Sequence, residues 1–289
     1  MAVIESAAAA RGPAGSRKIW LCADDYGIAP GVNSAIRDLV ARGRLNATSA
    51  MVVAPSLTPS QAAALGGLNA DSRRVAIGLH LTLTAPFRPL TSGFAPRAEG
   101  QFLPIQAMMR LAVLRRLDRA AIAAEARAQL AAFATLFGRP PDFVDGHQHV
   151  HVLPRVRDAV LAAVKDAAPN AWMRQCGGVS TASPLSDPKA MVLNWFSRGF
   201  KRRARRAGVT VNPAFAGTYT FSPDADFAML FPRFLDGLPA DSVVMCHPGI
   251  VDAELERLDP LTTLRQREYD YLRGDVFPNV LTQQGVTLG

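Results

Sequence analysis

The sequence predicts an α/β protein with the architecture of an irregular (β/α) barrel of the TIM type. Apolar runs rich in β-branched residues alternate with segments of helical periodicity along most of the 289 residues, an order typical of a parallel sheet covered by helices. No Pro-, Gly- or Ser-rich linker divides this pattern. Polar side chains follow several predicted strands, and four strand ends must converge if these side chains act together. A barrel allows that convergence more readily than a doubly wound sheet.

Six apolar runs have the length and composition of buried strands. The first, RKIWLCA, is followed at once by the acidic pair Asp24-Asp25, and the third contains His80. A last segment, Gln283–Gly289, fits either a short strand or a trailing coil. The predicted strands are Arg17–Ala23, Thr48–Ala54, Val75–Leu83, Phe143–His147, Ala171–Arg174 and Ser242–His247.

Seven segments are predicted as helices, and Pro or Gly residues mark several of their ends. Between Ala85 and Gln106, Pro and Gly are frequent and periodicity is lost, which predicts a long loop near the functional site. The predicted helices are Gly31–Arg42, Thr58–Leu65, Leu117–Phe137, Pro154–Asp166, Lys189–Ala207, Asp224–Leu235 and Leu261–Arg273.

Composition indicates one domain, residues 17–289, after a flexible N-terminal extension, residues 1–16. The extension lacks the basic start and long apolar core of a signal peptide. No apolar run reaches the roughly 20 residues that cross a bilayer. The cysteines Cys22, Cys176 and Cys246 are odd in number and have no paired spacing, so we expect reduced thiols in a cytoplasmic protein.

The formal net charge of +8 is concentrated in the run from Lys201 to Arg206. Such a run is most often a solvated helix face. Contact with an anionic lipid surface or an anionic substrate is the alternative, so peripheral membrane contact stays open while a transmembrane segment is not expected. No nucleic-acid-binding module or aromatic stacking pattern accompanies the basic run, which argues against nucleic acid as a partner.

All five histidines lie at or near predicted strand ends, and three of them fall within VDGHQHVH. One carboxylate and two imidazoles, with positions left for water, describe a catalytic divalent-metal site. Such an ion lowers the pKa of bound water and polarises a carbonyl. Of the pair Asp24-Asp25, one can bind metal while the other accepts a proton. Neighbours on a strand point opposite ways, so both can serve only if the chain bends there, as Gly27 allows.

In an extended segment, His147, His149 and His151 would share one face. His247 suits a general acid, and Arg174 could orient an aspartate or hold a substrate oxygen. Each feature also has an ordinary structural explanation: a lone histidine is often a core residue, and an acidic pair is often a turn or cap. Their joint occurrence at strand ends favours a functional site.

Four motifs occur in the order ADDYG, GLHLTL, DGHQHVH and MCHPG. Together they resemble the YdjC-like carbohydrate deacetylases of the ChbG and HpnK type, from about Lys18 to about Gly249. The resemblance implies an irregular βα barrel that removes acetyl groups from N-acetylated sugars with a divalent metal. Carried onto this sequence, it implies metal ligands at Asp25, His80 and His147. By analogy with related polysaccharide deacetylases, it implies Asp24 as base and His247 as acid. The sequence itself adds His149, His151 and Arg174 as candidate substrate or supporting residues.

The resemblance implies one divalent ion, with magnesium or zinc ahead of manganese or cobalt. It leaves the substrate as an N-acetylated oligosaccharide or glycolipid, and it admits a homodimer. Two other functions stay open on the residues alone. A pair of histidines with one carboxylate also describes a non-haem iron oxygenase, although a chain of alternating strands and helices does not favour it. A non-catalytic sugar-binding barrel is the other, and the complete acid, base and ligand set argues against it.

Overall fold

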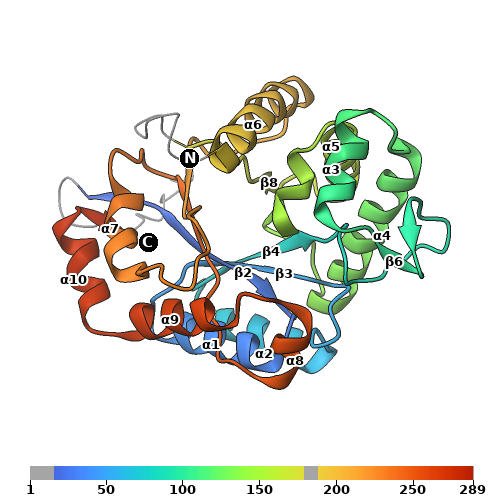
Figure 1. Cartoon of the computed structure of the whole chain (residues 1–289). Helices are drawn as coiled ribbons and strands as arrows, with labels where there is room; N and C mark the ends of the chain where they lie inside the picture. Colours follow the sequence, from blue (N-terminus) through green and yellow to red (C-terminus); the bar gives the residue numbers. More distant parts are fainter. Residues whose placement is uncertain (1–15, 179–187, 289) are drawn as a thin grey trace, which may run out of the picture.

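The computed structural model describes residues 16–178 and 188–288, and within them seven strands form one parallel sheet (Figure 1). These strands are β2 (Trp20–Tyr26), β3 (Ala47–Ala50), β4 (Ala76–Leu81), β7 (Phe143–Gly146), β8 (Trp172–Met173), β9 (Phe215–Ala216) and β10 (Val243–Cys246). Their spatial order is β8-β7-β4-β3-β2-β10-β9, and every neighbouring pair is parallel. The sheet curls into a half-barrel, which confirms the predicted class.

The two edges of the half-barrel approach each other without forming a continuous ladder. Met173 of β8 makes an isolated parallel bridge to Val211, in the segment that leads to β9. The backbone N–H of Met173 donates to the carbonyl of Thr210 at 2.8 Å. The barrel is therefore irregular at this seam, as expected from strands as short as two residues.

Helices surround the sheet, and four short strands of the described residues lie outside it. Strand β1 (Arg17–Lys18) pairs with β11 (Val286–Thr287), so the final segment is a short strand; β5 (Arg97–Ala98) and β6 (Gln101–Phe102) form an antiparallel hairpin. The helices are α1 (Pro30–Ala41), α2 (Pro59–Gly66), α3 (Ile105–Val113), α4 (Arg119–Phe137), α5 (Val156–Ala167), α6 (Pro188–Ala207), α7 (Phe227–Leu235), α8 (Ala253–Leu258), α9 (Thr262–Arg273) and α10 (Val276–Gln283), with 3₁₀ turns η1 (Gly67–Asn69) and η2 (His147–Val152).

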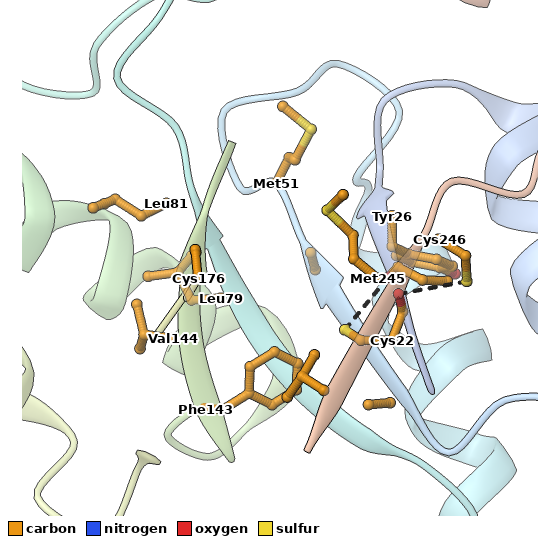
Figure 2. Close-up of a cluster of buried hydrophobic side chains, with 14 of the residues drawn as sticks. Cys22, Tyr26, Met51, Leu79, Leu81, Phe143, Val144, Cys176, Met245 and Cys246 are labelled. Atoms are coloured by element: carbon orange, nitrogen blue, oxygen red, sulfur yellow. Dashed lines mark hydrogen bonds between the residues drawn. The ribbon is translucent and has the colours of Figure 1, made fainter. Parts of the chain in front are cut away.

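Apolar side chains from neighbouring strands fill the core (Figure 2). Phe143 of β7 stacks on Trp172 of β8, with ring centroids 4.5 Å apart. The three cysteines lie in this core as free thiols: Cys22 and Cys246 on adjacent strands, and Cys176 just after β8. Burial raises the pKa of all three thiols, which makes them poor nucleophiles.

The region Ala85–Gln106, predicted as a long loop near the functional site, begins at the pocket with Ala85 and Pro86. It is not loop throughout, because it contains the hairpin β5–β6 and the start of α3. That part of the prediction is wrong because tertiary contacts, not local pattern, order the segment. Glu125 of α4 accepts bonds from the backbone N–H groups of Leu90 (3.0 Å) and Thr91 (2.9 Å). Gln129, one turn later, pairs with both backbone groups of Thr82. Helix α4 thereby holds the segment that leaves β4.

Within the described residues, α4 is the one helix long and apolar enough by composition to cross a membrane. It packs against α5, and its buried face carries Glu125 and Gln129 at 0% exposure. Those hydrogen-bonded polar residues make it the core helix of a folded domain.

The C-terminal segment passes over the carboxyl end of β2. The backbone N–H of Gly31, at the start of α1, donates to Asp252 at 2.6 Å. A Cβ at position 31 would lie 2.1 Å from the carbonyl oxygen of Ile250, so only glycine permits this approach. Ser56 donates to Glu254 of α8 at 2.7 Å. These contacts bring α8, α9 and the turn between them to the carboxyl end of β2.

Candidate metal centre

A pocket of about 650 Å³ opens at the carboxyl ends of the central strands. That volume falls within the range of about 300–1,000 Å³ typical of small-molecule sites. Its polar lining comes from β2, β4, the turn after β7, the end of β10 and helix α9, and its apolar lining includes Pro86, Phe221 and Leu261. The predicted residues that reach it are Asp24, Asp25, His80, His147, His149 and His247.

A bend within β2 lets both aspartates face the pocket. Asp25 has φ +70°, and the pairing of β2 with β3 shifts register between Ala23 and Tyr26. The bend that the sequence required therefore lies at Asp25 itself, two residues before Gly27, which also has a positive φ of +103°. A non-glycine residue in this region is strained unless its surroundings hold it. Contacts to the Asp25 carboxylate provide that restraint.

Asp25, His80 and His147 come together from three strands. Oδ1 of Asp25 lies 3.0 Å from Nε2 of His80 and 3.0 Å from Nδ1 of His147. The three ligand atoms all lie within 4.8 Å of one another. Two ligands about 2.1 Å from one octahedral ion lie about 3 Å apart, so the set fits a small divalent cation in both chemistry and spacing.

His80 is held from behind by Asp145, a residue that the sequence analysis did not single out. Oδ1 of Asp145 lies 2.7 Å from Nδ1 of His80, and Ser49 Oγ lies 3.0 Å from the same nitrogen. This leaves Nε2 facing Asp25. Burial opposes the charged form of His80, yet the carboxylates around it, Asp145 first, raise its pKa to about 10. The carboxylates around His80 thus stabilise positive charge, as expected at a site that binds a cation.

Arg174 pairs with the other aspartate of the acidic motif. Its Nη1 and Nη2 donate to the two oxygens of Asp24, each at 2.6 Å. Nη2 also lies 2.5 Å from Oδ2 of Asp145. Both Arg174 and Asp145 are completely buried, and isolated charges at such depth would be strongly destabilising. Of the two roles that the sequence left open for Arg174, the structure places it against an aspartate.

A second arginine, Arg265 of α9, restrains Asp25. Its Nη2 donates to Oδ2 of Asp25 at 2.5 Å and also pairs with Asp259. Burial alone would raise the pKa of Asp25, but the charges of Arg265 and His147 hold it well below its ordinary value. The carboxylate that faces the two histidines is therefore ionised. Neither Arg265 nor Asp259 was predicted, since each lies in a segment with no recognisable motif.

The segment after β7 differs from the extended conformation considered for it. Strand β7 ends at Gly146, and Gln148 and His149 have left-handed φ angles of +52° and +57°. His147, His149 and His151 therefore do not share one face, because the chain turns between them. That expectation is wrong.

The turn sends the three imidazoles in different directions. His147 faces Asp25, whereas His149 lines the pocket with Nδ1 3.6 Å from Cys176 Sγ. His151 is fully buried behind the pocket, where Nε2 lies 2.8 Å from the carbonyl oxygen of Arg174. Burial lowers the pKa of His149 to about 3 and that of His151 to about 4. Both are neutral near pH 7, and only His149 reaches the cavity.

His247 enters the pocket from the end of β10. Its backbone N–H donates to Oε2 of Glu268 at 2.5 Å, and Glu268 accepts a second bond from Tyr219 at 2.7 Å. Phe221 packs edge-on against the imidazole, with centroids 5.6 Å apart. Nδ1 of His247 is buried and has no hydrogen-bond partner among the described residues. The ring is therefore held by packing.

The family model described as YdjC-like protein matches residues 18–283. A chitooligosaccharide deacetylase of Yersinia pestis (strain Pestoides F) is 31% identical over 272 residues, covering 92% of this chain and 95% of that protein. The same figures hold for a chitooligosaccharide deacetylase of Yersinia pseudotuberculosis serotype O:1b. A solved structure from Enterococcus faecalis V583, provisionally described as a cellobiose-phosphate cleavage protein, matches this chain with a TM-score of 0.73 at 19% identity. The match covers 95% of this chain and 97% of that protein, and it shows the fold alone. Since the family model and the relatives each span nearly all of it, this chain belongs to the YdjC-like family.

Proposed function

We propose that the protein is a metal-dependent hydrolase that removes the acetyl group from an N-acetylated sugar, either an oligosaccharide or a glycolipid. The observation that carries the proposal is one pocket holding two distinct sets of groups: Asp25, His80 and His147 in contact, and Asp24 in a bidentate pair with Arg174. The deacetylase names of its Yersinia relatives support the same reaction class.

Asp25, His80 and His147 would hold one divalent ion, and magnesium, zinc, manganese and cobalt all accept this donor set. Such an ion would supply a water of lowered pKa and polarise the amide carbonyl. Asp145 positions His80 for this task because it engages Nδ1 and leaves Nε2 free as a ligand. Arg265 positions Asp25 in the same way through Oδ2.

Asp24 would accept the proton of the attacking water. Both of its oxygens accept from Arg174, so the plane of the carboxylate is set before substrate arrives. Oδ1 also accepts from the thiol of Cys22, whereas Oδ2 accepts only from Arg174 among the described residues and retains a lone pair for the proton. His247, entering from β10, would donate a proton to the departing amine. Neither transfer requires a residue from outside the pocket.

Acetate release is the decisive measurement. After chelation, single metals are added back, and release is measured from N-acetylglucosamine oligomers and N-acetylated glycolipids. Restored release with magnesium, zinc, manganese or cobalt is expected, and it should be lost in Asp25→Ala and His147→Ala. Metal-restored release at a wild-type rate in either variant would contradict the proposal. Turnover that requires ferrous iron and oxygen would instead indicate the iron oxygenase.

His149→Ala provides a matched control because it alters the same turn. Its imidazole lines the pocket yet lies outside the Asp25 group. We expect His149→Ala to keep one bound ion per chain and to change KM, whereas His147→Ala loses the ion. Equal loss of metal in both variants would mean that the turn, rather than the His147 ligand, is what the substitutions disturb.

A further inference from the structure

Helices α3 and α6 expose large apolar side chains beside each other. A shallow groove of about 380 Å³ runs between them. Nine large apolar side chains are exposed among the described residues, and five of them lie on α6 or at the end of α3: Val113 (55%), Leu114 (54%), Met191 (50%), Val192 (46%) and Trp195 (65%). Val113, Leu114 and Val192 line the groove itself. Monomeric proteins seldom gather such side chains without a partner. These five residues and the basic residues around them are called the α3/α6 surface below.

Positive charge continues the apolar stripe along α6. Met191 and Trp195 are followed on the same helical face, at spacings of three or four residues, by arginines. The exposed basic residues of this helix are Arg198, Lys201, Arg202, Arg205 and Arg206. Among residues 191–207 of α6, Arg203 is the one in an ion pair, with Asp158 at 3.0 Å. The helix is thus apolar in its first half and cationic in its second.

Basic residues of α6 and of the turn after α3 lie close to Arg157 of α5. Its guanidinium lies against Gly199 of α6, where a Cβ would be 2.4 Å from Nη1. Burial lowers the pKa of Arg157, and the charges of Arg203, Arg202 and Arg115, the last in the turn after α3, lower it further against the opposing effect of Asp158. Arg110 and Arg116 are also exposed at this end of α3. The apolar side chains of both helices therefore have exposed basic residues beside them.

The α3/α6 surface flanks the turn that carries His147. Both helices contact η2, and they lie on the same side of the strands, α3 in green and α6 in yellow (Figure 1). Phe200 of α6 packs edge-on against His151, with centroids 5.6 Å apart. Ser197 accepts a bond from the backbone N–H of Cys176 at 2.8 Å. Helix α6 is therefore fixed to the core on one face while its other face is open.

We propose that the α3/α6 surface docks on an anionic membrane, with Trp195 and its apolar neighbours in the interface and the arginines on lipid phosphates. An apolar face bordered by Lys and Arg is the pattern of peripheral membrane helices, and anionic lipid attracts each such charge. A second copy of this chain fits less well, since a symmetric contact would oppose two sets of basic residues. The inference does not depend on the proposed reaction.

The test is sedimentation of the full chain with vesicles of phosphatidylcholine, with and without phosphatidylglycerol. We expect binding to the anionic vesicles only, and weaker binding at high salt. Arg202→Ser/Arg205→Ser should bind about 25-fold more weakly, from roughly fivefold per charge. Val113→Ser/Trp195→Ser should also weaken binding. Trp195 is the one exposed tryptophan, so its emission should shift to the blue on binding, and Trp195→Phe should bind without that shift.

Controls change matched residues elsewhere. Arg73→Ser/Arg74→Ser removes two exposed charges before β4, and Met229→Ser/Val276→Ser removes two exposed apolar side chains from α7 and α10; both should bind like wild type. No binding, equal binding to neutral vesicles, or equal losses in the controls would overturn the proposal. A dimer that Trp195→Ser dissociates would overturn it in favour of self-association. Asp25→Ala should still bind vesicles, which separates this result from the proposed catalysis.

Discussion

The guanidinium of Arg174 engages Asp24 through two parallel hydrogen bonds, each 2.6 Å long. The same Nη2 lies 2.5 Å from Asp145, whose other oxygen is 2.7 Å from Nδ1 of His80. One chain of buried charges therefore runs from the proposed base to a proposed metal ligand. Because the groups share partners, a change at one of them should reach the other, and the variants below separate their roles.

Arg174→Lys should lower kcat with little effect on KM. Lysine keeps the charge but cannot form the two-pronged contact that sets the plane of Asp24. Displacement of a catalytic group by about 1 Å can cost roughly 10²-fold in rate, and we expect a loss of that order. Steady-state kinetics on an N-acetylated sugar measures it, with bound metal and circular dichroism as checks. An unchanged kcat in a folded, metal-loaded variant would show that the paired contact with Arg174 does not position Asp24 for catalysis.

Asp145→Asn should weaken metal affinity by about 10–100-fold, the usual cost of losing a carboxylate behind a ligating histidine. Calorimetric titration of the chelated protein measures this directly. Asp142→Asn is the matched control, because Asp142 precedes the same strand and pairs with Arg73 and Arg139 outside the pocket. It should bind metal like wild type. Similar losses in the two variants would indicate general loosening of β7.

The alternation of apolar runs and helical segments was enough to predict the parallel sheet and most of its helices. It could not predict the order in the Pro- and Gly-rich region Ala85–Gln106, where Glu125 of α4 accepts bonds from the backbone N–H groups of Leu90 and Thr91. Nor could it predict the left-handed turn at Gln148 and His149. Local sequence gives extended and turning conformations similar weight there, and long-range packing decides between them.

The proposed ligands were visible in the sequence because histidine is rare in this chain and occurs at strand ends. The supporting residues were not. Arg265 contacts Asp25 across 240 positions, and arginines are abundant on the surface of this protein, so nothing local distinguishes it. Asp145 did carry a signal, since it lies two residues before His147 at the end of a buried strand. An aspartate buried in an apolar strand requires a partner.

His247→Asn should slow deacetylation according to how poor the leaving group is. A general acid contributes about 10²–10⁴-fold in rate, and we expect a loss in this range on N-acetylated sugars. The phenolate of an aryl acetate leaves without taking up a proton, so the rate of aryl acetate hydrolysis should fall far less. Comparing kcat for the two substrates in one variant measures the effect. Equal losses on both would show that His247 shapes the pocket instead of donating a proton.

Glu268→Gln should change how stability depends on pH. Glu268 is 1% exposed, and burial raises its pKa above the ordinary 4.5, although His247, Tyr219 and Arg265 favour the charged form. The folded state therefore holds this proton more tightly than the unfolded chain. The resulting stability is fully present below pH 4.5 and is lost as the pH rises through the folded-state pKa.

Glutamine cannot ionise, so the stability of Glu268→Gln relative to wild type should increase from about pH 4.5 towards neutrality. Thermal unfolding of both proteins at a series of pH values measures the difference. Glu256→Gln, on the exposed face of α8, should track wild type throughout. Glutamine has one acceptor oxygen where the carboxyl group has two, so the bond from Tyr219 or His247 is lost and the Tm of Glu268→Gln falls by a constant amount. Only the trend of the Tm difference with pH reports the ionisation of the carboxyl group. A difference in Tm that stays flat or moves the other way would mean that Glu268 is ionised in the folded protein as readily as in the unfolded chain.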